Sequence, residues 1–333
     1  MSLVRAEGLR AYYITNAYGV RRVVKAVDNV TLEVRENEIL GIAGESGCGK
    51  STLMKTLLGI VEPPLSVVGG RVVYTVSGRE LDVVRTPQEV LDEVRWSHVS
   101  YIPQGSMNVL NPVRRIKHIF RDFIAHRGKR MSPAELLDWA TRHLKLLGLP
   151  SEVLEAYPHQ LSGGMKQRVT IALATILKPR VVFADEPTTA LDVIVQRGVI
   201  QLLSRIQAEE KNSLVLVTHD MAVHAHLAHR IAIMYAGKVI EEGSTAEIFR
   251  APQHPYTQYL IGSLPRIGSK GYRTSAPGNP PRLDRPLSGC RFQDRCPKAM
   301  PQCKDASPAL VQSGDDHKVA CFLVSPKEEK ESA

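Results

Sequence analysis

The sequence predicts an α/β fold in which helices cover a buried, mostly parallel sheet. Three short runs support this prediction: "ILGIAG" (39–44), "VVFAD" (181–185) and "SLVLVTHD" (213–220). They are apolar almost throughout, as strands buried on both faces are. A helix-like stretch follows each run, so strand and helix alternate as they do in a doubly wound core.

The segments around these runs predict the remaining architecture. Residues 1–40 are expected to form short strands of an antiparallel subdomain, because "VVKAVDNVTLEV" alternates apolar and polar positions. Residues 105–178 are mostly helix-like and predict an inserted helical subdomain. From residue 266 Pro and Gly become frequent and four cysteines follow. We therefore divide the chain into a main domain, 1–265, and a cysteine-rich C-terminal extension, 266–333.

Composition narrows the class of protein. The chain has 333 residues, of which 43% are apolar, which is ample for a packed core. Its net charge of +9 comes from basic residues spread along the chain, which indicates general surface charge rather than a nucleic-acid site. No apolar run approaches the ~20 residues of a membrane-spanning helix, and the first residues lack the apolar core of a secretory signal. We therefore expect a cytosolic chain, where clustered cysteines more often bind metal than form disulfides.

The stretch "GESGCGKST" (44–52) directly follows the first apolar run and precedes a helix-like run. It fits G-x-x-x-x-G-K followed by Ser or Thr, the phosphate-binding loop of nucleotide-binding proteins, and this is the context that the motif requires. Lys50 is expected to reach the β- and γ-phosphates of ATP, and Ser51 to bind Mg²⁺. The other residues expected to line the nucleotide are Gly44, Ser46, Gly47, Cys48, Gly49 and Thr52. The Cys48 side chain is expected to be incidental, because the loop acts through its backbone; a reactive thiol of lowered pKa is the alternative.

Two further motifs extend this site. "VVFADEP" (181–187) predicts a second strand whose Asp185 holds Mg²⁺ through water and whose Glu186 polarises the attacking water. "LSGGMKQR" (161–168) places Ser162 before Gly163 and Gly164 at the start of a helix. Backbone N–H groups and a hydroxyl at a helix start form a second anion site.

These motifs together resemble the ATP-binding subunits of ABC transporters. The resemblance implies a P-loop NTPase core of the ABC type and two subunits that enclose ATP head to tail. The phosphate-binding loop of one subunit would then face the 162–164 motif of the other. It further implies that Gln104, in "SYIPQ", binds Mg²⁺ and senses the γ-phosphate, that Asp192, in "TALD", signals across the dimer, and that His219, in "LVTHD", contacts the γ-phosphate.

The same resemblance implies an aromatic residue that stacks on adenine. Tyr13, in "LRAYY", occupies its place, and Tyr12 and Tyr18 are close alternatives.

The C-terminal region resembles one branch of this family. "HPYTQYLIGSLP" (254–265), the Pro/Gly-rich stretch and the cysteines are similar to the extension of oligopeptide and dipeptide importer ATPases, in particular the first of their two unlike ATPase subunits. This implies an unlike ATPase partner, two membrane permease subunits that residues 105–120 would meet, an extracytoplasmic substrate-binding protein, and a peripheral place on the cytoplasmic face of the membrane. Oligosaccharides and nickel remain alternative cargoes to peptides.

The tail cysteines are spaced C-x5-C-x6-C-x17-C, at Cys290, Cys296, Cys303 and Cys321. Structural zinc sites usually use C-x2–4-C pairs, which this spacing lacks, and tandem ferredoxin spacing is absent too. Ligands on longer loops suit a larger group, such as a 4Fe–4S cluster, and the resemblance to the importer ATPases implies such a cluster. Zinc, disulfides or no function at all remain alternatives.

Two competing functions have weaker support. A soluble cassette ATPase of DNA repair or translation would fit the basic charge, but the chain has no long coiled-coil insertion and no second cassette. We therefore expect no nucleic-acid partner. A module that binds nucleotide without hydrolysis is disfavoured because Glu186 and His219 are both present.

Overall fold

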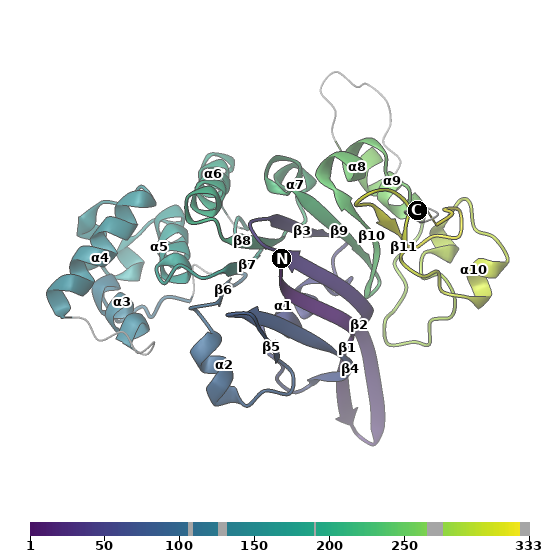
Figure 1. The fold of residues 1–333 in the computed structure, drawn as a ribbon, viewed down its shortest axis with the longest axis horizontal. Helices are drawn as coiled ribbons and strands as arrows, with labels where there is room; N and C mark the ends of the chain where they lie inside the picture. The colour runs from purple at the N-terminus through teal and green to yellow at the C-terminus, as the bar shows by residue number, and fades with distance from the viewer. Residues whose placement is uncertain (106–108, 126–131, 190, 265–275, 327–333) are drawn as a thin grey trace.

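The structure is a computed structural model that describes residues 1–105, 109–125, 132–189, 191–264 and 276–326. It contains two sheets, with a group of helices on one side and the C-terminal extension on the other (Figure 1). The boundary predicted at residues 265 and 266 lies outside the described residues.

The larger sheet has eight strands in the order β11-β12-β10-β9-β3-β8-β7-β6. Its strands are β3 (Ile39–Ala43), β6 (Val99–Ile102), β7 (Val181–Asp185), β8 (Ser213–Val217), β9 (Arg230–Tyr235), β10 (Lys238–Ser244), β11 (Val311–Gln312) and β12 (Lys318–Val319). The five strands from β9 to β6 pair in parallel, and the other pairs are antiparallel. The three predicted strands are β3, β8 and β7, adjacent and wholly buried, which confirms the α/β prediction.

A helix follows each of these three strands, as expected. They are α1 (Lys50–Leu57) after β3, α6 (Val193–Glu210) after β7 and α7 (Met221–Leu227) after β8. Because the strands are parallel, the loops that lead into the helices all leave from one edge of the sheet. The predicted nucleotide-binding motifs are carried by these loops.

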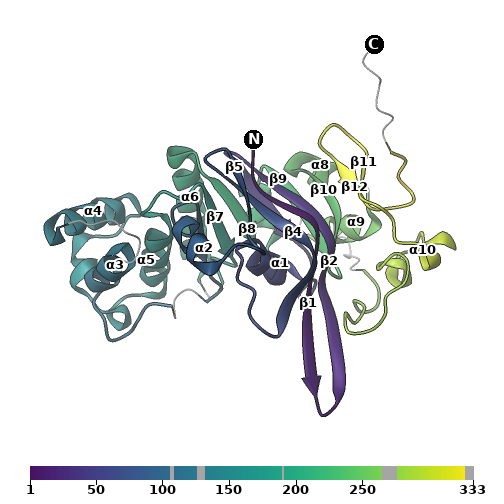
Figure 2. The same ribbon diagram turned by 60° about the horizontal axis from the view of Figure 1, so that its bottom comes forward.

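The smaller sheet is antiparallel, with the order β2-β1-β4-β5. Its strands are β1 (Ser2–Ala17), β2 (Val20–Arg35), β4 (Leu65–Val76) and β5 (Arg79–Asp82). The antiparallel N-terminal subdomain is therefore confirmed, but the expectation of short strands is wrong. β1 and β2 have 16 residues each and form a hairpin that projects from the molecule (Figure 2). Several register shifts interrupt their alternation of apolar and polar positions without ending the pairing, which explains the error.

The helical region between β6 and β7 contains α3 (Ile116–Ala125), α4 (Pro133–Leu146) and α5 (Gly163–Thr175), while α2 (Gln88–Val94) precedes β6. Helices α3, α4 and α5 pack together beside the parallel sheet (Figure 1). Ser132 and Glu135 start α4 with reciprocal side-chain bonds to each other's backbone N–H. The described residues of this region are thus mostly helical, as expected, and its limits at 105 and 178 stay a prediction.

The C-terminal part contains α8 (Thr245–Arg250), α9 (Pro255–Gly262) and α10 (Gln302–Asp305). β12 pairs with β10, so the extension joins the edge of the large sheet. Across the described part of the chain, no helix is both long enough and apolar enough to span a membrane.

Candidate nucleotide-binding site

The loop between β3 and α1 closes around the Lys50 ammonium. Lys50 Nζ donates to the carbonyl oxygens of Gly44 and Glu45, at 2.8 and 2.9 Å. Gly49, at the N-terminal end of α1, has φ +106°, and a Cβ there would lie 2.0 Å from the carbonyl oxygen of Ala26. Only glycine fits that position, so the loop can bring its backbone N–H groups to the start of the helix.

Ser51 and Asp185 meet beside this loop. The Ser51 hydroxyl donates to Asp185 Oδ1 at 3.2 Å, which joins the first turn of α1 to the end of β7. Burial raises the pKa of Asp185, and the Ser51 hydrogen bond opposes that rise. A hydroxyl and a carboxylate are oxygen donors of the kind that Mg²⁺ prefers.

Three loops converge on the carboxylate of Glu186. Gln104 Nε2 and the Thr189 hydroxyl both donate to Glu186 Oε2, each at 2.9 Å. His219 Nδ1 lies 3.5 Å from Glu186 Oε1. Three residues that the sequence predicts for catalysis are thus brought together. Thr189 was not predicted, although its place beside "DEP" is a signal that could have found it.

The 162–164 motif starts α5 as predicted, but its groups face solvent. The Ser162 hydroxyl accepts from the backbone N–H of Met165 at 3.3 Å, and both Ser162 and Gly163 are exposed. A Cβ on Gly164 would lie 2.6 Å from Val195, so glycine lets α5 begin close to α6. In the described part of the chain, the Ser162 side chain thus bonds to its own helix rather than to the phosphate-binding loop.

Asp192 also caps its own helix. Its carboxylate accepts from the backbone N–H of Val195 at 2.9 Å, which starts α6. The next two residues, Val193 and Ile194, are 80% and 85% exposed.

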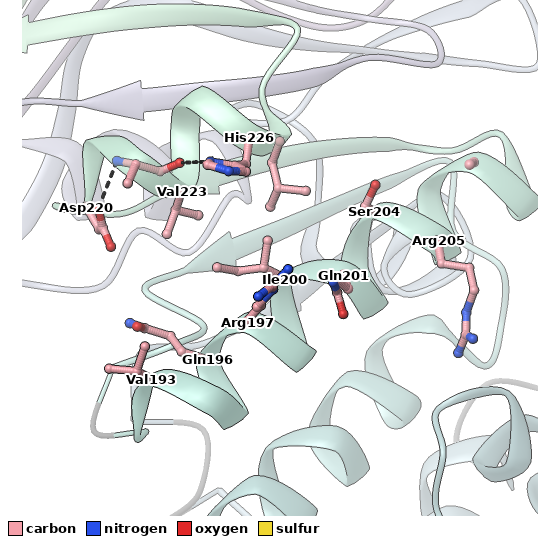
Figure 3. Close-up of a pocket in the computed structure, with 13 residues that line it drawn as sticks. Val193, Gln196, Arg197, Ile200, Gln201, Ser204, Arg205, Asp220, Val223 and His226 are labelled. Carbon is pink, nitrogen blue, oxygen red and sulfur yellow. Dashed lines mark hydrogen bonds between the residues drawn. The ribbon is translucent and has the colours of Figure 1, made fainter. Parts of the chain in front are cut away.

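A groove of about 760 Å³ lies between α6 and α7 (Figure 3). It is lined by Val193 and by Asp220, the residue after His219.

The structure separates the three candidate tyrosines. The Tyr13 hydroxyl lies 3.3 Å from the Thr52 hydroxyl in the first turn of α1. Tyr12 instead donates to Asp28 at 2.6 Å, and Tyr18 is fully exposed at the tip of the β1–β2 hairpin. Only Tyr13 among them contacts the phosphate-binding motif.

Cys48 is buried, with its Sγ 3.8 Å from Lys50 Nζ. Burial raises the pKa of the Cys48 thiol more than Lys50 lowers it. The lowered pKa on which the alternative of a reactive thiol depended is therefore wrong, because desolvation outweighs the influence of Lys50.

The four tail cysteines, Cys290, Cys296, Cys303 and Cys321, line one small cavity. The Cys290 N–H donates to the Cys303 carbonyl oxygen at 2.7 Å, and all four are free thiols. Burial raises the pKa of the Cys290, Cys296 and Cys321 thiols, and neighbouring thiols contribute. Among the described residues, no three His, Cys, Asp or Glu side chains converge closely enough to hold a single metal ion.

Comparisons with known proteins agree with this geometry. The sequence model of the ABC transporter family matches residues 27–189. The dipeptide transport ATP-binding protein DppD of Caldanaerobacter subterraneus subsp. tengcongensis is 41% identical over 323 residues, which is 96% of this chain and 97% of that protein. The chain belongs to the ABC transporter family. A second model, the C-terminal region of oligopeptide/dipeptide transporters, matches residues 240–303 of this ABC cassette and so includes three of the four tail cysteines.

Other relatives are similar over most of the cassette. The oligopeptide transport ATP-binding protein OppD of Salmonella typhimurium is 38% identical over 90% of this chain and 88% of that protein. Among solved structures, the ATP-binding cassette MJ0796, a dimer bound to ADP and Pi, superposes with a TM-score of 0.63 at 27% identity. That match covers 73% of this chain and 99% of MJ0796. The fold and ATPase class of the ABC cassette are therefore those expected from its sequence.

Proposed function

We propose that this ABC cassette hydrolyses ATP to power the uptake of dipeptides or oligopeptides. The observation that carries the proposal is the Glu186 carboxylate, which Gln104, Thr189 and His219 surround at the edge of the sheet beside the phosphate-binding loop. The relatives named for peptide transport, which match along nearly the whole chain, support the cargo.

Phosphoryl transfer to water depends mainly on position and charge, and the proposed roles follow from that. Lys50 neutralises charge on the β- and γ-phosphates, and Glu186 orients the attacking water. His219 contacts the γ-phosphate. The proposed Mg²⁺ ligands are Ser51, Asp185 and Gln104. The proposed nucleotide contacts are Tyr13, which stacks on adenine, and Gly44, Ser46, Gly47, Cys48, Gly49, Lys50, Ser51 and Thr52.

A second cassette completes the site in this proposal. Ser162, Gly163 and Gly164 would contact ATP held by the partner, and Asp192 would carry the signal across the interface. Exposure of Ser162 and Gly163 and of the apolar residues Val193 and Ile194 supports a surface that closes against another cassette. The partner would be an unlike ATPase subunit.

The remaining assembly follows from the family. The cassette 1–265, with its helical subdomain 105–178, would act with two permease subunits and an extracytoplasmic binding protein, on the cytoplasmic face of the membrane. Residues 105–120 would meet the permeases. Residues 106–108 of that segment lie outside the described residues, while Arg115 and Lys117 form ion pairs with Glu155.

The extension 266–333 would hold a 4Fe–4S cluster through Cys290, Cys296, Cys303 and Cys321. The donor set fits, because four thiols line one cavity. The spacing C-x5-C-x6-C-x17-C supports such a cluster over zinc, because structural zinc sites usually use C-x2–4-C pairs. When bound, such a group can supply one-electron chemistry or a structural cross-link. Anaerobic purification followed by iron, zinc and sulfide assays tests this: roughly four irons per chain are expected, whereas one zinc would contradict the proposal.

Transport itself tests the cargo. The full complex, purified through a tag on this chain and placed in lipid vesicles with its binding protein, is expected to take up labelled dipeptides or oligopeptides only when ATP is present. Lys50→Ala should abolish uptake, and Arg285→Ala, at an exposed arginine, should not. Uptake of an oligosaccharide or of nickel, with no uptake of peptide, would overturn the proposed cargo but leave the proposed ATPase activity in place.

A further inference from the structure

The C-terminal extension contacts the phosphate-binding loop directly, through Arg295. This residue lies in the segment between Cys290 and Cys296, and its side chain is only 7% exposed. Arg295 Nη1 and Nη2 donate to Glu45 Oε2 and Oε1, at 2.9 and 3.1 Å. Two parallel bonds between a guanidinium and a carboxylate fix orientation as well as charge. Glu45 is the second residue of the phosphate-binding motif, 250 positions earlier in the chain.

Two carbonyl oxygens of the extension and a tyrosine of β9 leave Arg295 little freedom to move. Nε donates to the Pro277 carbonyl oxygen at 2.7 Å, Nη1 to the Tyr235 hydroxyl at 3.2 Å, and Nη2 to the Ala276 carbonyl oxygen at 3.3 Å. Together with the two bonds to Glu45, these use all five N–H groups of a guanidinium. The Glu45 carboxylate is therefore held by a group that is itself fixed.

Glu45 is also held through its backbone. Its N–H donates to the Tyr256 hydroxyl on α9 at 2.9 Å. Its carbonyl oxygen accepts from Lys50 Nζ at 2.9 Å and from the Cys48 N–H at 3.2 Å. One residue thus connects the extension to the lysine that is expected to bind the phosphates, and a shift of Glu45 would move a carbonyl that positions Lys50.

We propose that Arg295 is a positioning residue for the phosphate-binding loop, so that the C-terminal extension sets the affinity of the cassette for ATP. The inference rests on the nucleotide site proposed above. Backbone N–H groups bind phosphate well when the loop is already held in shape before the ligand arrives. The contacts described for Arg295 do not include Gln104, Glu186 or His219, so the hydrolysis step itself should depend on it little.

Binding of a non-hydrolysable ATP analogue with Mg²⁺ to the full chain, measured by titration calorimetry, tests the proposal. Arg295→Gln should raise the Kd at least about five-fold, the lower end of typical coupling between sites. KM for ATP should rise likewise, with kcat nearly unchanged. Arg295→Lys should restore part of the affinity, because it keeps the charge but loses the paired bonds. Arg285→Ala, at an exposed arginine of the same extension, should have no effect.

A double-variant comparison separates positioning from general stability. Glu45→Gln should weaken binding in the same way, and the double variant should be no weaker than the poorer single variant, because both remove one interaction. Tyr256→Phe covers the case in which Arg295→Gln folds poorly. It removes the hydroxyl that accepts from the Glu45 N–H, and it should also raise the Kd.

The outcomes distinguish this inference from the proposed function. Unchanged ATP affinity in folded Arg295→Gln and Tyr256→Phe, or independent additive effects of the Glu45 and Arg295 variants, would overturn the inference while leaving the nucleotide site in place. An absence of saturable binding by the unaltered chain would instead overturn the proposed nucleotide site, and this inference with it.

Discussion

The cassette has two glycine-rich helix starts suited to phosphate, and they differ in how the chain completes them. The loop before α1 is enclosed: Lys50 is 7% exposed and bonds to the loop carbonyls, and Glu45 is held by Arg295 and Tyr256. The start of α5 is open: Ser162 is exposed and bonds to its own helix. This difference is what the proposed two-cassette site requires, because there the enclosed loop binds ATP and the open helix start contacts ATP held by the partner.

Glu186→Gln has the largest expected effect. It tests whether the enclosed half of the site carries out ATP hydrolysis. Turnover of ATP should fall by about 10²–10⁴, the usual contribution of a positioned base, while ATP still binds. Phosphate release and nucleotide affinity are the measurements. Glu209→Gln, an exposed glutamate on α6, is the matched control and should behave as the unaltered chain. Turnover by Glu186→Gln at the unaltered rate would remove Glu186 from the mechanism.

Ser162→Arg and Lys50→Ala, measured side by side, test the difference between the two helix starts. Lys50→Ala should abolish ATP binding by the isolated chain. Ser162→Arg should leave that binding intact but lower turnover in the assembled complex by about 10²–10³, as loss of a preorganised donor does. Equal loss of ATP binding in both isolated variants would show that the open half acts within its own chain.

Tyr13→Ala tests the adenine end of the enclosed half. Stacking of an aromatic ring on a base contributes about 1–3 kcal/mol, so the Kd for ATP should rise by roughly five-fold or more. Tyr18→Ala removes a fully exposed tyrosine from the same hairpin and should leave the Kd unchanged. A larger effect from Tyr12→Ala than from Tyr13→Ala would reverse the assignment.

The smallest expected effect concerns stability, away from both helix starts. Burial lowers the pKa of His143, His224 and His254 to about 4. Between the usual value near 6.5 and about 4, the unfolded chain binds protons that the folded chain does not, so stability falls as pH falls through this range. The unfolding midpoint should drop on acidification, and less steeply in His143→Gln than in the exposed-site control His226→Gln. Equal pH dependence of the two variants would contradict this.

The sequence predicted well what depends on local pattern. The strands β3, β7 and β8, the loop around Lys50 and the serine-capped start of α5 each follow from short-range spacing. Strand β9 was not predicted, because it begins with a charged residue that is buried in the fold. Arg230 forms ion pairs there with Glu38 and Glu242, one of them 192 positions away.

At the candidate site, too, the sequence could not predict contacts between residues that are far apart in the chain. The motif names Glu45 only as a variable position, and spacing cannot show that Arg295 reaches it. The sequence assigned Tyr13 to adenine with Tyr12 and Tyr18 as alternatives, and spacing alone could not show that the Tyr13 hydroxyl lies beside Thr52. The raised pKa of the Cys48 thiol depends on burial, which outweighs the influence of Lys50 and which local sequence does not reveal.

In the proposed mechanism, ATP is enclosed by two cassettes, one of which is this chain. The most direct measurement is made on the complex that contains the Glu186→Gln variant, purified through a tag on this chain in the presence of Mg²⁺ and ATP. Its native mass and its nucleotide content are determined. Two cassette subunits are expected in each complex, with ATP that exchanges slowly. A complex with one cassette, or with two cassettes that exchange ATP as fast in Glu186→Gln as in the unaltered protein, would contradict it.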